Sequence, residues 1–353
     1  MNMMDSVSIL QSLIKIPSFS REESAVADFL EEKMKSLFNA EIHRYKNNLW
    51  VVSPTYDAQK PTLLLAAHLD TVKPTGNWTK DPFSATVEDN TLFGLGSNDD
   101  GINVVVFLSV FEKLMKSPQT YNFVLALTAE EEVSGKDGIE ALLPKLPKID
   151  FAIVGEPTNL NLAMAEKGLM VLDVVAKGRS GHAARNEGEN AIYKAVRAID
   201  WFQNYRFDKT SEFLGDVKMT VTQINAGTQH NVVPDKCSFV VDIRSNELYS
   251  NQEILDIVKT NMVDCEVMAR STRLNSTFTP QNELVKKAIC LGANTFGSPT
   301  LSDQALLTFP SVKIGAGDSA RSHTADEYIL IPEIEKGIDF FVEWLNGAEV
   351  EFL

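Results

Sequence analysis

The segment TLLLAAHLD, residues 62–70, decides the fold of this chain and locates its first informative polar side chains. Residues 62–67 carry no charge and predict a buried strand, and His68 and Asp70 follow it at once. Side chains two positions apart on a strand face the same side, so these two can converge. The segment therefore predicts a strand whose carboxyl end carries a metal ligand.

Two further apolar segments end in acidic residues. The strand predicted at residues 123–127 leads to the triplet EEE at residues 130–132, and the strand predicted at residues 151–154 precedes Glu156. A helix predicted at residues 102–116 lies between the first two of the three strands. Alternating helices and near-continuous apolar strands predict an α/β fold, a parallel or mixed sheet covered by helices on both faces. The carboxyl ends of such strands form a ligand crevice, so the polar residues are expected to share one site.

The acidic triplet favours a metal site at this crevice. Three consecutive glutamates at a strand end repel one another unless a cation is present, and a bound divalent metal reverses that penalty. The alternative interpretation of the triplet by itself is an acidic surface loop. Its place beside the HxD segment at residues 68–70 and the GEPT segment at residues 155–158 makes the metal site the stronger hypothesis.

The segment GLGSNDDG, residues 94–101, links a short predicted strand to the helix at residues 102–116. Its glycines allow a tight turn. Asp99 or Asp100 then lies at the helix N-terminus, where a carboxylate often serves only as a cap. The segment is not a dinucleotide-binding fingerprint, because an acidic residue replaces the third glycine.

The middle of the chain has a different order of predicted strands and helices. Its predicted order, βαββαβ, is the ferredoxin-like pattern, and it predicts a lid or dimerisation domain at residues 168–278 inserted into a discontinuous catalytic domain, residues 1–167 and 279–353. The elements are strands at residues 171–176, 218–224, 238–243 and 266–270 and helices at residues 190–204 and 251–261; afterwards come a helix at residues 282–291, an apolar stretch at residues 309–314 and a helix at residues 332–345.

The N-terminal region predicts two amphipathic helices. Residues 1–18 lack the continuous apolar run of a secretory leader. Ser20 and Glu23 have the spacing of a capping box that opens the second helix. The longest apolar run, residues 102–111, is too short to span a bilayer. We therefore expect a cytoplasmic protein with no membrane partner.

Composition narrows the functional classes further. The net charge of -15 argues against nucleic acid or anionic lipid as a partner. The three cysteines, Cys237, Cys265 and Cys290, are far apart, which argues against a disulfide framework or a thiolate zinc site and favours a reducing compartment. The sequence has no GxSxG segment and no cysteine beside a histidine, which argues against a serine or cysteine hydrolase.

Taken together, these segments resemble the M20 family of metallopeptidases and deacylases, and within it acetylornithine deacetylase and succinyl-diaminopimelate desuccinylase. The matching pieces run from residue 68 to residue 323 in the family's order, and the resemblance covers essentially the whole chain. It implies two zinc ions, although histidine and carboxylate ligands also suit cobalt or manganese. The implied metal ligands are His68 and Glu156 on one ion, Glu132 and His323 on the other, and Asp99 bridging them.

The resemblance also implies the catalytic residues. Asp70 would orient the imidazole of His68. Glu131 would be the general base and later the general acid. His182 would stabilise the tetrahedral oxyanion, and in dimeric relatives the equivalent histidine reaches across from the partner subunit. The resemblance therefore implies a homodimer.

Substrate contacts are implied at four positions. Asn231 and Arg244 match family positions that hold polar groups of the substrate, and Arg is well shaped to clamp a carboxylate. The loop from Gly315 to Gly317 could offer backbone N–H groups to the same anion. The alternative for Arg244 is a surface pair with Asp242 or another acid.

The expected activity is hydrolysis of an amide bond in a small acylated amino acid. N-acetyl- or N-succinyl-ornithine, in arginine biosynthesis, is the first expected substrate and succinyl-diaminopimelate the second. A dipeptidase or carboxypeptidase would use the same metal centre. A non-enzymatic metal-binding protein is the alternative from another class; it would have lost the base or a ligand, and the sequence retains both.

Overall fold

The structure is a computed structural model that describes residues 3–350. The chain divides into two compact units. In the described range, unit 1 comprises residues 3–164, 279–296 and 302–350, and unit 2 comprises residues 165–278 and 297–301. The sequence pattern gives no sign that residues 297–301 belong with unit 2.

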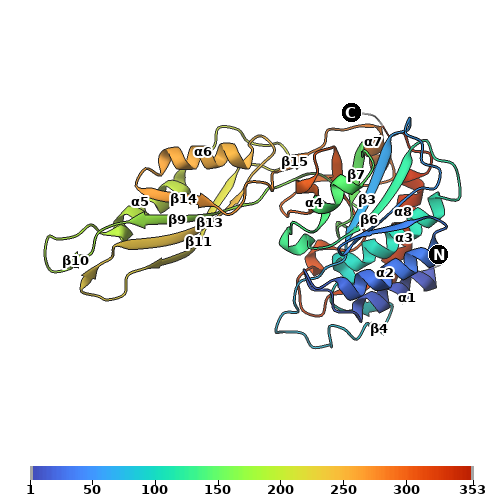
Figure 1. The fold of residues 1–353 in the computed structure, drawn as a ribbon, viewed down its shortest axis with the longest axis horizontal. Coiled ribbons are helices and arrows are strands. Elements are labelled where there is room, and N and C mark those ends of the chain that lie inside the picture. Colours follow the sequence, from blue (N-terminus) through green and yellow to red (C-terminus); the bar gives the residue numbers. More distant parts are fainter. Residues whose placement is uncertain (1–2, 351–353) are drawn as a thin grey trace. The chain divides into compact units, whose positions relative to one another are not determined.

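A mixed sheet forms the centre of unit 1 (Figure 1). The strands β3, β6 and β7 are parallel and buried along their whole length. The α/β fold expected from the sequence is confirmed. The sheet order is β1 (Ile42–Tyr45), β2 (Asn48–Val52), β6 (Asn122–Thr128), β3 (Thr62–His68), β7 (Phe151–Val154), β17 (Ser311–Lys313), β8 (Leu162–Glu166) and β15 (Thr277–Phe278), with β16 (Thr295–Ser298) paired to β8.

Helices cover both faces of this sheet. On one face α3 (Ile102–Leu114) contacts β3 and β6, and its Phe111 stacks on Phe123 of β6 with ring centroids 5.2 Å apart. On the other face, Val124 and Ala126 pack with α4 (Ile139–Leu142). This double cover explains why the strands are apolar at successive positions. The other helices of unit 1 are α1 (Met3–Ile14), α2 (Ser24–Leu37), α7 (Glu283–Cys290) and α8 (Ile331–Leu345).

The parallel strands deliver their carboxyl ends to one edge of the sheet. His68 lies opposite Thr128 in the register of β3 and β6, and Ala66 lies opposite Val154 in that of β3 and β7. A small sheet beside this edge pairs β4 (Thr86–Glu88) with β5 (Thr91–Phe93) and β5 with β18 (Tyr328–Leu330). The segment of residues 94–101 leaves β5 toward the same edge.

Unit 2 contains an antiparallel sheet in the order β11 (Lys218–Ala226), β13 (Lys236–Arg244), β9 (Met170–Lys177) and β14 (Cys265–Ala269). The helices α5 (Ala191–Asn204) and α6 (Asn251–Asn261) pack on one face of it. Along the chain the order is βαββαβ, as the sequence pattern indicates. A separate ribbon pairs β10 (Gly181–His182) with β12 (Val232–Val233).

The N-terminal helices correct two expectations. Helix α1 ends at Ile14, before Ser18, and residues 1 and 2 lie outside the described range. The capping box is wrong, because α2 begins at Ser24 and Glu23 makes no side-chain cap. Ser20 instead donates to Asp70, and Glu23 accepts from the N–H groups of Arg21 and Glu130, so other partners replace the expected cap. No helix in the described range has the length and apolar character to cross a membrane.

Candidate metal centre

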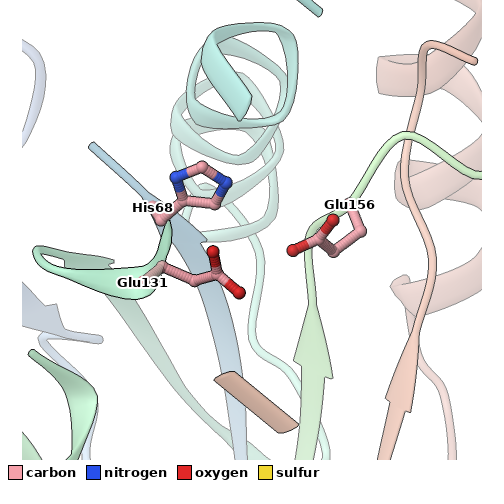
Figure 2. A group of neighbouring side chains, drawn as sticks. All are labelled: His68, Glu131 and Glu156. Carbon is pink, nitrogen blue, oxygen red and sulfur yellow. The ribbon is translucent and has the colours of Figure 1, made fainter. Parts of the chain in front are cut away.

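Six side chains of unit 1 converge where the parallel strands end. Donor atoms of His68, Glu131 and Glu156 lie within 4.8 Å of one another, and their side chains point toward a common centre (Figure 2). A second group, within the same limit, joins His68 to Asp99 and Glu132. The sixth side chain is His323, described below.

His323 comes from a loop far along the chain. Its Nε2 lies 3.0 Å from Glu132 Oε2 and 3.7 Å from Asp99 Oδ2, and its side chain remains 54% exposed. Asn98 holds this loop in place, accepting a hydrogen bond from the N–H of Asp318 at 2.9 Å and donating one to its carbonyl at 3.0 Å. All five predicted ligands and the predicted base are thus brought together.

The structure separates the roles of Asp99 and Asp100. Asp99 Oδ1 lies 3.1 Å from His68 Nε2 and faces the cluster. Asp100 accepts hydrogen bonds from the main-chain N–H of His68 at 3.3 Å and from Asn103 Nδ2 at 2.5 Å. Neither caps α3, whose N-terminus receives no side-chain hydrogen bond. Asp99 is therefore the one of the pair that is placed to bind a metal.

The three consecutive glutamates also differ in direction. Glu130 has a left-handed backbone with φ of 57°, and its carboxylate turns away to accept from the N–H of Asp137 at 3.4 Å. Glu131 and Glu132 face the cluster. Their main-chain N–H groups donate to the two carboxylate oxygens of Asp70, at 3.0 and 3.2 Å. The backbone turn at Glu130 thus aims its two neighbours into the site.

Asp70 fixes the orientation of His68 chiefly through its main chain. His68 Nδ1 lies 2.9 Å from the Asp70 carbonyl oxygen and 3.5 Å from Oδ1. A carbonyl oxygen can only accept, so Nδ1 donates to it and Nε2 faces Asp99. Burial alone would lower the pKa of His68, but hydrogen bonds to Asp70 and Asp99 raise it well above its ordinary value. Ser20 Oγ donates to Asp70 Oδ2 at 2.6 Å. Burial alone would raise the pKa of Asp70, but hydrogen bonding to His68 lowers it below its ordinary value.

The cluster holds four carboxylates, those of Asp99, Glu131, Glu132 and Glu156, and only two imidazoles. Burial, and then the charge of Glu156, raise the pKa of Glu131 well above its ordinary value. Burial and the charge of Asp99 do the same for Glu156. A hydrogen bond to Glu132 raises the pKa of His323 to about 9. Without a cation these groups must take up protons, so the imidazole and carboxylate donors fit divalent metal ions.

A buried acid behind the cluster was not anticipated from the sequence. Glu327 is 2% exposed and accepts hydrogen bonds from the main-chain N–H groups of Gly96, Asn98 and Asp99. Burial and the charge of Asp99 raise the pKa of Glu327 to about 8. The one signal in the sequence is an acid immediately before the apolar strand Tyr328–Leu330.

The glycine loop is packed against the site. The N–H of Gly315 donates to Thr158 Oγ1 at 3.1 Å. A Cβ at Gly315 would lie 2.4 Å from Asn103 Oδ1, and one at Gly317 would lie 2.6 Å from Asn98 Oδ1. The glycines therefore permit close packing of this loop on the residues that support the cluster.

The remaining predicted residues belong to unit 2. His182 lies on the β10–β12 ribbon and is exposed; its Nδ1 accepts from the N–H of Ala184 at 3.1 Å. Asn231 is exposed just before that ribbon's second strand. Arg244 forms two hydrogen bonds to Asp242, at 2.9 and 3.2 Å, which is the surface pairing considered as the alternative for this residue.

Comparisons with known proteins place the fold and the cluster in a family. Residues 64–347 match the model of Peptidase family M20/M25/M40. A succinyl-diaminopimelate desuccinylase of Ehrlichia ruminantium (strain Gardel) is 25% identical over 97% of both chains. The enzyme of that name from Psychromonas ingrahamii is 30% identical over 71% of both chains.

Solved structures agree on the fold. A tripeptidase from Staphylococcus aureus superposes with a TM-score of 0.79 at 22% identity and covers 98% of both chains. A dinuclear metal-binding M20 peptidase of Bacillus subtilis superposes with a TM-score of 0.75 at 15% identity, covering 98% of this chain and 97% of the other. The chain belongs to the M20 family and is a metal-dependent hydrolase.

Proposed function

We propose that the protein is a two-metal amidohydrolase that removes a small acyl group from the nitrogen of an amino acid. The observation that carries the proposal is the pair of donor groups that share His68, each with its ligand atoms within 4.8 Å. One group contains Glu131 and Glu156 and the other Asp99 and Glu132. Five ligands for two ions, with a further carboxylate beside them, are what metal-assisted hydrolysis requires.

We assign His68 and Glu156 to one ion, Glu132 and His323 to the other, and Asp99 to both. The 3.1 Å contact of Asp99 with His68 and its 3.7 Å contact with His323 support a bridging position between the two histidines. Zinc is the proposed metal, and cobalt or manganese would suit the same donors. When bound, the ions would supply Lewis acidity that polarises the amide carbonyl and acidifies water.

Glu131 is the proposed general base. Its carboxylate takes a proton from the attacking water, whose oxygen bonds to the carbonyl carbon. As the C–N bond breaks, Glu131 delivers that proton to the departing amine nitrogen. Asp70 supports this role, because its carboxylate accepts from the N–H of Glu131 and holds the backbone of the base.

We further propose that His182, Asn231 and Arg244 contact the substrate and that the working unit is a homodimer. Their exposure or half-exposure in unit 2 supports a role in binding a mobile ligand. A histidine acting from the partner subunit is testable by mixing two inactive variants, Glu131→Gln and His182→Ala. Recovery of activity in mixed dimers supports action across the interface, and no recovery at matched concentrations contradicts it.

The proposed substrate is an N-acylated diamino acid with succinyl as the acyl group. The relatives named succinyl-diaminopimelate desuccinylase support the succinyl group. N-acyl-ornithine, in arginine biosynthesis, remains a proposed substrate from the sequence motifs. The cytoplasm is the proposed location, which the three free cysteines support.

A substrate panel tests the function. Acetylated and succinylated ornithine, citrulline and diaminopimelate, together with simple dipeptides, are incubated with the zinc-loaded protein, and release of free amine is measured. Metal-dependent release from the acylated amino acids is expected. Turnover of dipeptides alone would replace the proposal with a peptidase. A protein that binds two ions and releases no amine from any compound would contradict hydrolysis of this class.

A further inference from the structure

Glu327 is placed by the main chain beside the loop that carries Asp99. The strand β18 begins at the next residue and pairs with β5, with Tyr328 opposite Phe93. The N–H of Gly94 donates to the Glu327 carbonyl oxygen at 2.9 Å, which continues this pairing. Because β5 leads straight into the segment of residues 94–101, the side chain of Glu327 enters the inside of that turn.

The carboxylate of Glu327 binds three main-chain N–H groups of this turn. Oε2 accepts from Gly96 at 2.9 Å, and Oε1 accepts from Asn98 at 2.8 Å and from Asp99 at 2.9 Å. A buried carboxylate is costly unless hydrogen bonds compensate it, so an acid that is 2% exposed needs such a set of donors. The same carboxylate provides the hydrogen-bond acceptors for three N–H groups of the turn.

This arrangement fixes Asp99 from the side opposite the metal ligands. The main-chain N–H of Asp99 is held by Glu327, while its carboxylate faces His68 and His323. Gly96 makes the turn tight: its φ is +73°, and a Cβ there would lie 2.5 Å from Thr71 Cγ2. A turn of this kind has little freedom to adjust once the Glu327 bonds are formed.

The same C-terminal segment also supplies a ligand. His323 lies four residues before Glu327, and Asn98 of the turn bonds to Asp318, which lies five residues before His323. The segment therefore carries one metal ligand and holds the backbone of another.

We propose that Glu327 is a positioning residue for the metal centre, which holds the turn that carries Asp99 through three hydrogen bonds, one of them to the N–H of Asp99, and so sets the affinity for the pair of ions. The inference rests on the proposed two-metal centre and adds a residue that does not touch the metals. Outer residues that orient metal ligands typically affect metal affinity by about 10- to 100-fold.

The test compares Glu327→Gln with a matched buried acid. In Glu327→Gln the new NH2 group opposes a main-chain N–H, and the turn loses at least one bond. Asp150→Asn is the control, since Asp150 is 7% exposed and accepts from the N–H of Thr62 at 2.9 Å, at the other end of β3. Calorimetric titration with Co2+ should show binding about 10- to 100-fold weaker in Glu327→Gln and unchanged in the control. The visible spectrum of bound Co2+ should change in Glu327→Gln alone, and excess Co2+ should restore its activity.

Wild-type affinity and an unchanged Co2+ spectrum in Glu327→Gln would overturn the proposal. If that variant does not fold, hydrogen exchange of the metal-free wild-type protein decides the question. The amides of Gly96, Asn98 and Asp99 should be protected, and exchange at unprotected rates would equally overturn it. Failure of the proposed function is separate, because it would appear as wild-type protein that binds two Co2+ ions and hydrolyses no acylated amino acid.

Discussion

The candidate residues of unit 1 and unit 2 differ in how firmly the fold holds them. In unit 1, Asp70 accepts from Ser20, Glu131 and Glu132, and each ligand at the sheet edge has a neighbour within the cluster. In unit 2, His182 and Asn231 are exposed on a two-stranded ribbon and the residue beside it. The difference teaches that the geometry of the candidate metal centre is built into the fold, whereas the residues proposed to contact the substrate lie on an exposed surface. Prearranged charge is what catalysis by electrostatics needs.

Removal of metal should have the largest effect. We expect a chelator to abolish hydrolysis, because the carboxylates of unit 1 then have no Lewis acid to act with, and zinc or cobalt to restore it. Bound metal at about 1,000 times its dissociation constant should add about 4 kcal/mol to the free energy of unfolding. Thermal melting with and without chelator measures this. Full activity in the presence of chelator would contradict the proposal that the cluster in unit 1 acts through bound metal.

Glu131→Gln should lower kcat by about 10²- to 10⁴-fold, since an amide cannot take the proton from water. Elemental analysis should still find two ions per chain, because the assigned ligands remain. Glu130→Gln is the matched control: it is the adjacent residue, its carboxylate faces Asp137, and its activity should be near that of the wild type. The reverse result would show that the base is assigned one residue out of register.

His182→Ala should lower kcat by about 10²- to 10³-fold through loss of an oxyanion donor, with metal content unchanged. This variant sharpens the comparison, because it separates turnover from metal binding. His230→Ala, at another exposed histidine of unit 2, is the control and should retain activity. A loss of bound metal in His182→Ala would contradict its assignment to the substrate side.

Ser20→Ala should have the smallest effect. It removes the hydrogen bond to Asp70 Oδ2 and should weaken metal binding by about tenfold, through His68 and the backbone of Glu132. Ser36→Ala, which removes an exposed bond to the Lys33 carbonyl, should leave metal affinity unchanged. Equal metal affinities in the two variants would show that metal binding does not depend on the hydrogen bond from Ser20 to Asp70.

The sequence was sufficient for the parts of the site that follow directly from strand geometry. The buried strands at residues 62–68, 122–128 and 151–154 are parallel, so the residues after them share an edge wherever the helices lie. That alone predicts that the glutamate triplet meets His68 and Glu156, and the resemblance to the M20 family selected Glu131 within the triplet. The resemblance to the M20 family supplied His323, whose loop has no periodic pattern of its own.

The rest depended on the path of the main chain and on distant partners. The Gly-x-Gly-x-x-Asp spacing shared with the M20 family favours Asp99 over Asp100, and the structure adds the physical reason. The turn directs the Asp99 carboxylate toward the His68 ring and the Asp100 carboxylate toward the main-chain N–H of His68. Ser20 and Glu23 match a local capping pattern, yet Ser20 donates to Asp70, and Glu23 accepts from the nearby N–H of Arg21 and the distant N–H of Glu130. A local motif could not reveal the contacts with Asp70 and Glu130, because these partners lie 50 and 107 positions away.

The link between Glu327 and the turn at Asn98 has a consequence for synthesis of the protein. These two residues are separated by 229 positions, so a nascent chain exposes Asp99, Glu131 and Glu132 long before Glu327 leaves the ribosome. Domains begin to fold as they emerge. During translation the turn at residues 94–101 therefore lacks the hydrogen bonds of Glu327. It can reach its final conformation only after Glu327, which lies just before α8, has been synthesised. Binding of the proposed metal pair would then require a chain synthesised through Glu327, and a product terminated before residue 323 would lack both His323 and Glu327.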